Sequence, residues 1–303
     1  MMIYLLLGMT SEGGGAIAFP VMTLAFDISP VVARDFSLMI QSCGMSAAAA
    51  AIFIMRIQIE WHSLTLCSAG GAVGIVFGLH LIDPYLTSAQ KKMGFVSIWF
   101  SFAFALFLLN RMHKRTTFSK IENFCPWKGV LLFTSGVMGG IFSSFAGSGL
   151  DICSFSMLTL LFRVSEKVAT PTSVLLMAGN TIVGFYWRAF MSEPPISEDA
   201  WQFLAVCVPV VVLGAPLGSV LGSHFHRQVL ACLVYIIDVT ALVGAFVLVP
   251  LTTTLLIVSI VIIITGFSFF MIITYIGQKL LERTIKDTPN PAVLQDSTAS
   301  SKL

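Results

Sequence analysis

The sequence predicts an all-α polytopic membrane protein, and two observations carry this prediction. Hydrophobic residues make up 56% of the chain and charged residues only 11%, with a mean hydropathy of +0.91. Soluble domains carry roughly 25% charged residues, so this composition excludes an ordinary soluble domain. The apolar residues are also grouped into stretches of about 20, which is the length that a helix needs to cross a bilayer.

Nine such stretches follow one another, which predicts eight or nine transmembrane helices. Their ranges are 2–26, 31–55, 64–81, 93–110, 129–162, 168–190, 200–222, 229–249 and 252–277. The stretch at 129–162 is too long for one plain helix, so we expect either a helix followed by a half-helix or a re-entrant pair. The last two stretches are separated only by Pro250, which leaves their boundary open.

The chain divides into two membrane repeats joined by a linker. We expect a first membrane repeat at 1–110, a basic linker loop at 111–128, a second repeat with extra C-terminal helices at 129–277, and a polar, disordered tail at 278–303. The terminal Ser301-Lys302-Leu303 matches a peroxisomal address. That address is typical of matrix proteins, so on a polytopic membrane protein coincidence explains it better.

Glycines interrupt two of the apolar stretches, and the interruptions occur in related sequence. Sliding the chain by 136 positions pairs Gly13 with Gly149, Thr23 with Thr159, Leu24 with Leu160, Phe26 with Phe162, Ser29 with Ser165, Ala33 with Ala169 and Ser37 with Ser173. A broken helix in a bilayer is tolerated only where it is buried or lines a cavity. Paired breaks in two halves of a chain are the best sequence pointer to the substrate site of a transporter.

The relative orientation of the repeats follows from counting crossings. Four crossings separate the first broken stretch from the second, and an even number returns the chain to the same side, so we expect parallel repeats. The basic linker predicts a cytoplasmic location for that loop, and the basic start of the tail predicts the same. Five crossings separate linker and tail, however. Either one late stretch does not span, or one charge cluster breaks the rule.

Backbone N–H groups exposed at a glycine break can bind an anion, and polar helix faces follow both breaks. The candidate substrate-binding residues are Gly13, Gly14, Gly15, Ser37, Gln41, Ser144, Gly147, Ser148, Gly149, Thr172, Ser173 and Asn180. The alternative for the polar side chains is contact between helices, worth under about 2 kcal/mol each. The glycines at 70, 71, 74 and 78 are interpreted as a surface for close helix packing instead.

Three carboxylates lie among apolar residues, where a charge is costly and usually functional. They are Glu12, Asp151 and Asp238. Asp151 follows Gly149 by two residues, so it is the first candidate for a group that couples transport to a proton or a cation. An equally good interpretation is a plain cap at a helix N-terminus.

Four further charges lie close to the breaks. Arg34 and Asp35 come one turn into a predicted helix, where we expect a simple pair at the surface. Arg163 and Lys167 flank the second break, where they either guide an anion or mark the membrane interface. Ser29 followed by Pro30 predicts the start of the helix that follows the first break.

These residues resemble a known family. The motifs are the Gly-Gly-Gly…Pro run at 13–20 and the run from Ser29 to Ala33 with Ser37, which are repeated in related form at 147–149 and 165–173. They are similar to the TauE/SafE family of sulfite and organosulfonate exporters over roughly residues 8 to 270. The resemblance implies eight or nine helices in two repeats and the export of a small sulfur-containing anion. The chain departs from the family pattern in a shortened first helix and in the Ser-Gly-Leu-Asp that replaces a richer second glycine run.

The leading hypothesis is therefore a secondary transporter of a small anion, embedded in lipid, without catalytic residues, metal or cofactor. No basic patch interleaved with aromatic residues points to nucleic acid. One alternative is a membrane scaffold or receptor that transports nothing. Another is an intramembrane serine hydrolase built on Ser148, although the later His224 and His226 fall in a predicted loop, beyond the reach that a catalytic base needs.

Overall fold

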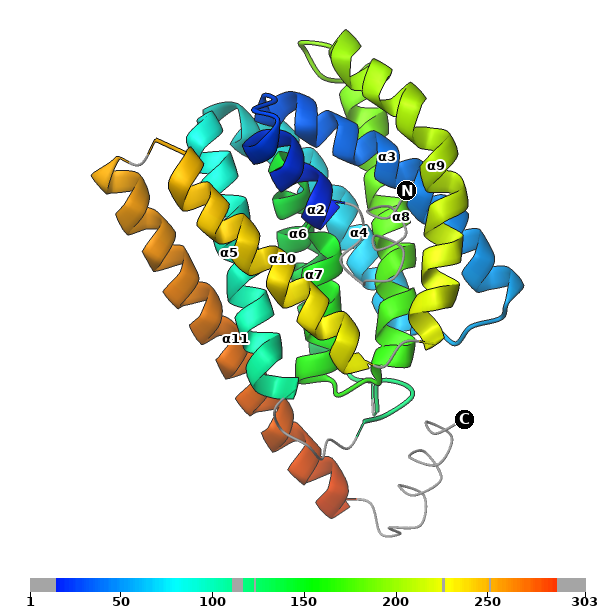
Figure 1. The fold of residues 1–303 in the computed structure, drawn as a ribbon. Helices are drawn as coiled ribbons and strands as arrows, with labels where there is room; N and C mark the ends of the chain where they lie inside the picture. The colour runs from blue at the N-terminus through cyan, green and yellow to red at the C-terminus, as the bar shows by residue number, and fades with distance from the viewer. Residues whose placement is uncertain (1–14, 111–116, 123, 225–226, 251, 288–303) are drawn as a thin grey trace.

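The computed structural model describes the chain except for residues 1–14, 111–116, 123, 225–226, 251 and 288–303. Helices account for 84% of the structure, and the described residues form no strand (Figure 1). Within the described residues, six helices are long and apolar enough to cross a membrane, and two shorter apolar helices lie at Leu150–Leu161 and Tyr235–Leu248. The chain is thus an all-α polytopic membrane protein, as its composition predicts.

The described elements follow one another in a simple order. They are α2 (Gly15–Pro20), η1 (Val21–Ala25), α3 (Pro30–Ile54), α4 (Trp61–Phe77), η2 (Gly78–Ile82), η3 (Asp83–Tyr85), α5 (Ser88–Asn110), α6 (Pro126–Ala146), α7 (Leu150–Ser156), η4 (Met157–Leu161), α8 (Glu166–Phe190), α9 (Glu198–His224), α10 (Arg227–Leu248) and α11 (Thr253–Asp287). The elements η1, η2 and η4 are single π-helical turns, and turns of this kind are frequent at functional sites.

The internal repeat that the sequence predicts is visible in the backbone. The helices α3 and α8 both have 25 residues and begin 136 positions apart, at Pro30 and Glu166. The π-helical turns η1 and η4 precede them at the same spacing. Between turn and helix, Asp27 (φ 50°) and Arg163 (φ 56°) both adopt the left-handed conformation, which is uncommon for residues other than glycine. We call residues 26–29 the first hinge and residues 162–165 the second hinge.

The predicted parallel orientation of the repeats is wrong, because α3 and α8 run antiparallel. Arg188 near the end of α8 donates to both carboxylate oxygens of Asp35 near the start of α3, at 3.0 and 2.8 Å. At the other end of the pair, the N–H of Glu60, which follows α3, donates to Thr172 near the start of α8, at 3.0 Å. Equivalent helices therefore cross the membrane in opposite directions, and the repeats are inverted.

The physical reason lies in the long apolar stretch at 129–162, which makes two passes rather than one. After α6 the chain reverses, and α7 packs back against α6. A Cβ placed on Gly149 would lie 2.6 Å from the Cβ of Phe142, and the N–H of Leu150 donates to Ser143 at 3.3 Å. The extra pass makes the number of crossings between the hinges odd, which inverts the second repeat.

The same extra pass resolves the conflict between linker and tail. Phe118 in the linker pairs with the second hinge through Phe118 N–H to Arg163 C=O (2.9 Å) and Ser165 N–H to Phe118 C=O (2.8 Å). Near the end of α11, Gly277 packs against the carbonyl of Leu160. The described part of the linker and the end of α11 therefore lie at one end of the bundle, toward the bottom of Figure 1. We call this end the linker face and the other end the opposite face.

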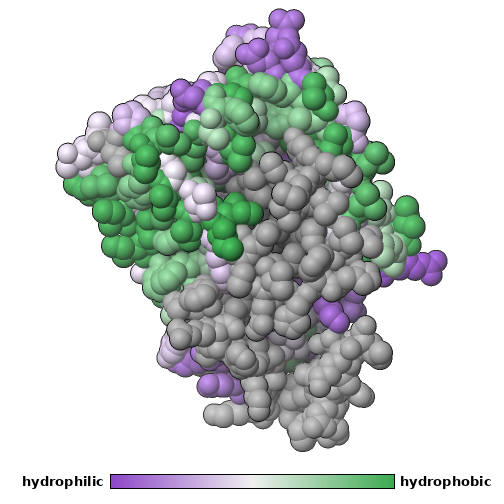
Figure 2. All heavy atoms as spheres, in the orientation of Figure 1, coloured by the Kyte–Doolittle hydropathy of each residue, from purple (hydrophilic) through white to green (hydrophobic). Residues whose placement is uncertain are grey.

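The bundle is held by close helix contacts and by an apolar outer surface. As expected from the glycines of α4, this helix packs backbone to backbone with α6, where a Cβ on Gly136 would lie 2.5 Å from the carbonyl oxygen of Cys67. Large apolar side chains such as Val206, Val247 and Ile264 are exposed on α9, α10 and α11. Figure 2 shows these hydrophobic flanks and a hydrophilic cap at the top, which is the surface expected of a protein surrounded by lipid.

Candidate functional site

The glycine break in the second repeat forms a tight buried loop between α6 and α7. Gly147 has φ 79°, in the left-handed region that favours glycine, and ends α6. A Cβ on Gly147 would also lie 2.6 Å from the Cβ of Ser37 on α3. Position 147 therefore requires glycine for two reasons, which are its left-handed conformation and the close approach of α3. We call residues 147–149 the break loop.

Two of the predicted site residues on α3 contact this loop directly. The side-chain amide of Gln41 donates to the carbonyl oxygen of Gly147 at 2.9 Å and to Oγ of Ser37 at 2.7 Å. Both side chains are buried. The Oε1 atom of Gln41 has no hydrogen-bond partner in the described structure. Gln41 thus fixes the loop against α3 and presents a free acceptor beside it.

The loop also holds the predicted coupling carboxylate. Asp151 is 1% exposed and lies in the first turn of α7, where it accepts a hydrogen bond from Oγ of Ser148 at 3.2 Å. Within the described residues no cationic side chain pairs with it. A buried carboxylate without a cation is costly when ionised, so this group is suited to binding a proton or a cation.

Asn180 on α8 completes the cluster from the other side. It is 2% exposed, and neither its Nδ2 nor its Oδ1 has a hydrogen-bond partner among the described residues. A Cβ on Gly71 would lie 2.9 Å from Leu150 and 3.0 Å from Asn180, which places the amide close to the start of α7. Buried amides are nearly always hydrogen-bonded, so the free amide of Asn180 indicates a place where a ligand or water binds.

Other predicted site residues lie elsewhere. Thr172 donates to the carbonyl of Val168 and accepts from Glu60, toward the linker face, and Ser173 bonds only within its own helix to Thr170, at 2.8 Å. Ser144 bonds to Ile141 and packs on Gly78 of η2. Gly13 and Gly14 lie outside the described residues, and Gly15 is the first residue of α2.

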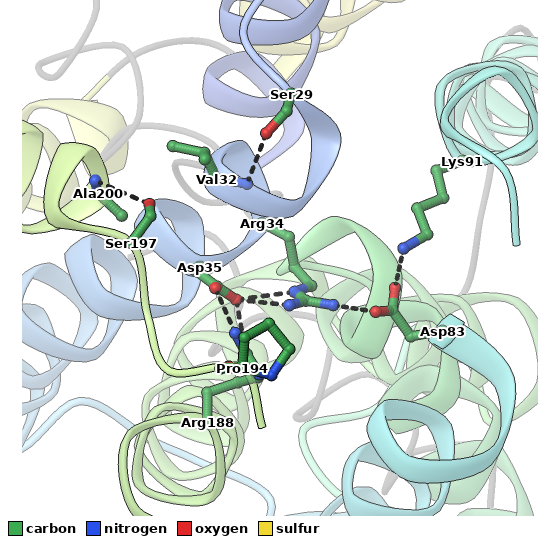
Figure 3. Close-up of polar contacts among 10 residues, drawn as sticks. All are labelled: Ser29, Val32, Arg34, Asp35, Asp83, Lys91, Arg188, Pro194, Ser197 and Ala200. Carbon is green, nitrogen blue, oxygen red and sulfur yellow. Dashed lines mark hydrogen bonds and ion pairs between the residues drawn. The ribbon is translucent and has the colours of Figure 1, made fainter. Parts of the chain in front are cut away.

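Sequence reasoning missed a buried network of charges beside the break loop. Arg34 and Asp35 pair as expected, but their expected place at the surface is wrong, because they are 2% and 1% exposed. Arg34 donates to Asp35 at 2.9 and 2.7 Å and also contacts Asp83. Arg188 holds Asp35 from α8, and Lys91 on α5 pairs with Asp83 at 2.6 Å (Figure 3). We call these five residues the charge network.

The charge network and the break loop are neighbours. A Cβ on Gly147 would lie 3.0 Å from the carbonyl oxygen of Arg34, and Arg34 precedes Ser37 by about one turn of α3. No local pattern could have revealed the network, because Asp83 and Arg188 lie 49 and 153 positions from their partners. The only local signal was the presence of charged residues in or beside apolar stretches.

Comparison with known proteins identifies the family. A family model described as sulfite exporter TauE/SafE matches residues 1–241, which include both hinges, the break loop and the charge network. The chain belongs to the TauE/SafE family. No curated protein and no solved structure matches it. The match leaves α11 outside, since that helix begins at Thr253.

Membership in the TauE/SafE family establishes the class of function. The family consists of exporters rather than enzymes, so this chain is a multi-pass membrane transporter of a small anion. This finding disfavours the serine hydrolase. In the structure Ser148 bonds to Asp151 rather than to a histidine. His224 is the last residue of α9 rather than a loop residue, and His226 lies outside the described residues.

Proposed function

We propose that this chain is a secondary transporter that exports a small sulfur oxyanion, sulfite or an organosulfonate, through a site at the break loop. The observation that carries the proposal is the free amide of Asn180, buried beside a broken helix. Its two N–H donors suit the oxygen atoms of an anion. Gln41 and Ser37 then act as positioning residues, because they fix the loop that faces the anion.

Asp151 is the proposed coupling group. A proton on this carboxylate would offset the charge of an anion that binds next to it, so anion and proton would cross the bilayer together at a lower electrostatic cost. The opposing interpretation is that Asp151 merely caps α7, since it lies in the first turn and bonds to Ser148. Replacing the carboxylate by an amide separates the two, because an amide can still accept a hydrogen bond but cannot exchange a proton.

The inverted repeats suggest a second half to the site. Ser37 contacts the break loop of the second repeat, and Ser173 is its equivalent 136 positions later. We therefore propose that Ser173 and Thr172 serve the first break, at Gly13, Gly14 and Gly15. Inverted repeats of this kind commonly enclose a substrate site near the middle of the membrane.

The proposed direction rests on the distribution of basic residues. Lysines and arginines cluster in the linker and at the start of the tail, which leave the bundle on one face. Because cytoplasmic loops carry an excess of these residues, we propose that the linker face is cytoplasmic. An exporter would then load its anion from the linker face and release it at the opposite face.

The decisive experiment is anion flux from proteoliposomes loaded with sulfite, sulfate or methanesulfonate, with and without an imposed proton gradient. The variants are Asn180→Ala and Asp151→Asn, and the control is Thr265→Val, which alters an exposed residue bonded only to its own helix. We expect Asn180→Ala to abolish most of the flux and Asp151→Asn to remove its dependence on the gradient.

Each other outcome has a definite meaning. Gradient-independent flux that is unchanged in Asp151→Asn would demote this carboxylate to a helix cap. Full flux in Asn180→Ala would show that the substrate site does not lie at the break loop. If the folded wild type moves none of the three anions, the proposed substrate class is wrong.

A further inference from the structure

The charge network carries one more positive charge than negative. Its cations are Arg34, Lys91 and Arg188, and its anions are Asp35 and Asp83. All five residues are at most 8% exposed. Each carboxylate bridges two cations, so the five form one connected group rather than separate pairs (Figure 3). The network is therefore one negative charge short of neutrality in a place where water does not compensate it.

Among the described residues, the other charges at the opposite face do not supply the missing negative charge. Asp27 pairs with Lys92, and its side chain is 94% exposed. Glu193, Glu198 and Asp199 are exposed to solvent. Interactions of exposed charges are screened by water and salt. A buried charge, in contrast, is costly unless it is paired.

The two arginines also have hydrogen-bonding capacity to spare. A guanidinium group has five N–H donors. Arg34 makes three hydrogen bonds to carboxylates. Arg188 makes two to Asp35 and one to the carbonyl oxygen of Pro194. Among the described contacts, each guanidinium thus retains two donors, which is the chemistry that binds the oxygen atoms of an oxyanion.

The network lies between the break loop and the opposite face. It joins α3, η3, α5 and α8, and it stands about one turn of α3 from the break loop on that side. An anion that moves between the break loop and the opposite face passes beside it. Its excess charge would attract such an anion, and its carboxylates would limit how tightly the anion is held.

We infer that the charge network is a second anion site that accepts one monovalent oxyanion on its way between the break loop and the opposite face. The inference rests on the proposed function, because it assumes that an anion crosses this bundle. A monoanion neutralises the network, whereas a dianion leaves a buried negative charge. The network thus favours sulfonates and other singly charged oxyanions over sulfate.

The test changes the net charge of the network with substitutions that preserve as many of its hydrogen bonds as possible. Lys91→Gln makes the network neutral, and Asp83→Asn raises its charge to +2. The double variant Asp83→Asn with Lys91→Gln restores +1 and leaves an oxygen for Arg34 to bond. Lys92→Gln is the matched control, because Lys92 is adjacent in sequence and pairs outside the network. Initial rates of methanesulfonate and sulfate efflux from proteoliposomes are measured for each.

We expect Lys91→Gln to lower methanesulfonate flux about tenfold or more, and the double variant to recover most of it, since the attraction for the anion follows the net charge. Asp83→Asn should raise the ratio of sulfate to methanesulfonate flux. Lys92→Gln should behave as the wild type. Size-exclusion chromatography establishes which variants are folded, and if Asp83→Asn alone does not fold, the other two carry the test.

A purely structural network predicts the reverse order, because the double variant loses more contacts than Lys91→Gln. A folded double variant that transports no better than Lys91→Gln therefore overturns the inference. So does a sulfate to methanesulfonate ratio that is the same in all folded variants. A wild type that moves neither of these anions and no sulfite refutes the proposed function itself, which keeps the two failures distinct.

Discussion

The two hinges have the same backbone conformation but differ in the contacts that stabilise them. Both contain a left-handed residue other than glycine, Asp27 in the first and Arg163 in the second. The side chain of Asp27 is 94% exposed and is held by one ion pair, whereas Arg163 is buried and its carbonyl is bonded to Phe118 of the linker. The repeated sequence thus specifies the bend, and the described part of the linker contacts only the second of the two bends.

This asymmetry has a consequence for movement. Inverted repeats that exchange conformations give alternating access to a central site. If the halves were equivalent, both hinges would be equally free to move. The linker is bonded to the second hinge, and the N–H of Ile121 in the same linker donates to Glu60 at the start of α4. The linker therefore connects the second hinge to α4, and the described residues contain no such connection for the first hinge.

The largest expected difference in stability comes from replacing the phenylalanine that begins each hinge. Phe26 is 71% exposed, while its equivalent Phe162 is 7% exposed and lies in the core. We expect Phe162→Ala to destabilise the protein by about 3 kcal/mol, since it leaves a cavity. Phe26→Ala should cost under about 0.5 kcal/mol, as other surface changes do. Thermal unfolding of both variants in the same detergent measures the difference, and equal shifts would mean that the hinges are anchored alike.

The sequence contained this repeat but not its orientation. The break at Gly147 and the helix starts after Ser29 and Ser165 were predictable, because each depends on residues close in the chain or repeated at a fixed spacing. The contact of Ser37 with the break loop was not, because it joins residues far apart in the chain. The break leaves the reversal between α6 and α7 as one of two alternatives, because the glycines mark an interruption but not the direction of the chain after it. The pairing of Arg34 with Asp83 was hidden for the same reason as the contact of Ser37, since Asp83 lies on another element far away in the chain.

A second difference concerns the break loop, which requires glycine at position 147. Gly147→Ala should destabilise the protein by about 2 kcal/mol and reduce anion flux, because alanine is strained at this positive φ and meets Ser37. Gly179→Ala on α8 is the control, since no atom lies within 4 Å of its Cβ position. It should stabilise the helix slightly. The comparison fails if thermal unfolding and flux respond equally to both changes.

The third difference concerns Gln41, whose equivalent in the second repeat is Met177. Gln41→Met makes the first repeat resemble the second and removes the hydrogen bond to Gly147. We expect a loss of about 1–2 kcal/mol, since the carbonyl of Gly147 loses this buried partner. The rate of anion efflux should fall more steeply than stability does, because the loop is no longer fixed. Efflux that falls only in proportion to the folded fraction would make Gln41 a structural residue.

The smallest difference lies in the caps of α3 and α8. The hydroxyl of Ser29 accepts a hydrogen bond from the N–H of Val32 at 3.4 Å, whereas Ser165 makes no such bond and is held through its backbone by Phe118. Ser29→Ala should therefore cost about 0.5 kcal/mol, at the low end for a helix cap, because the bond is long. Ser165→Ala should cost less, because the start of α8 is held by the backbone hydrogen bond from Ser165 to Phe118 rather than by a side-chain cap. A larger loss for Ser165→Ala would show that the second hinge depends on its own side chain rather than on the linker, and the contrast between the hinges would then rest on burial alone.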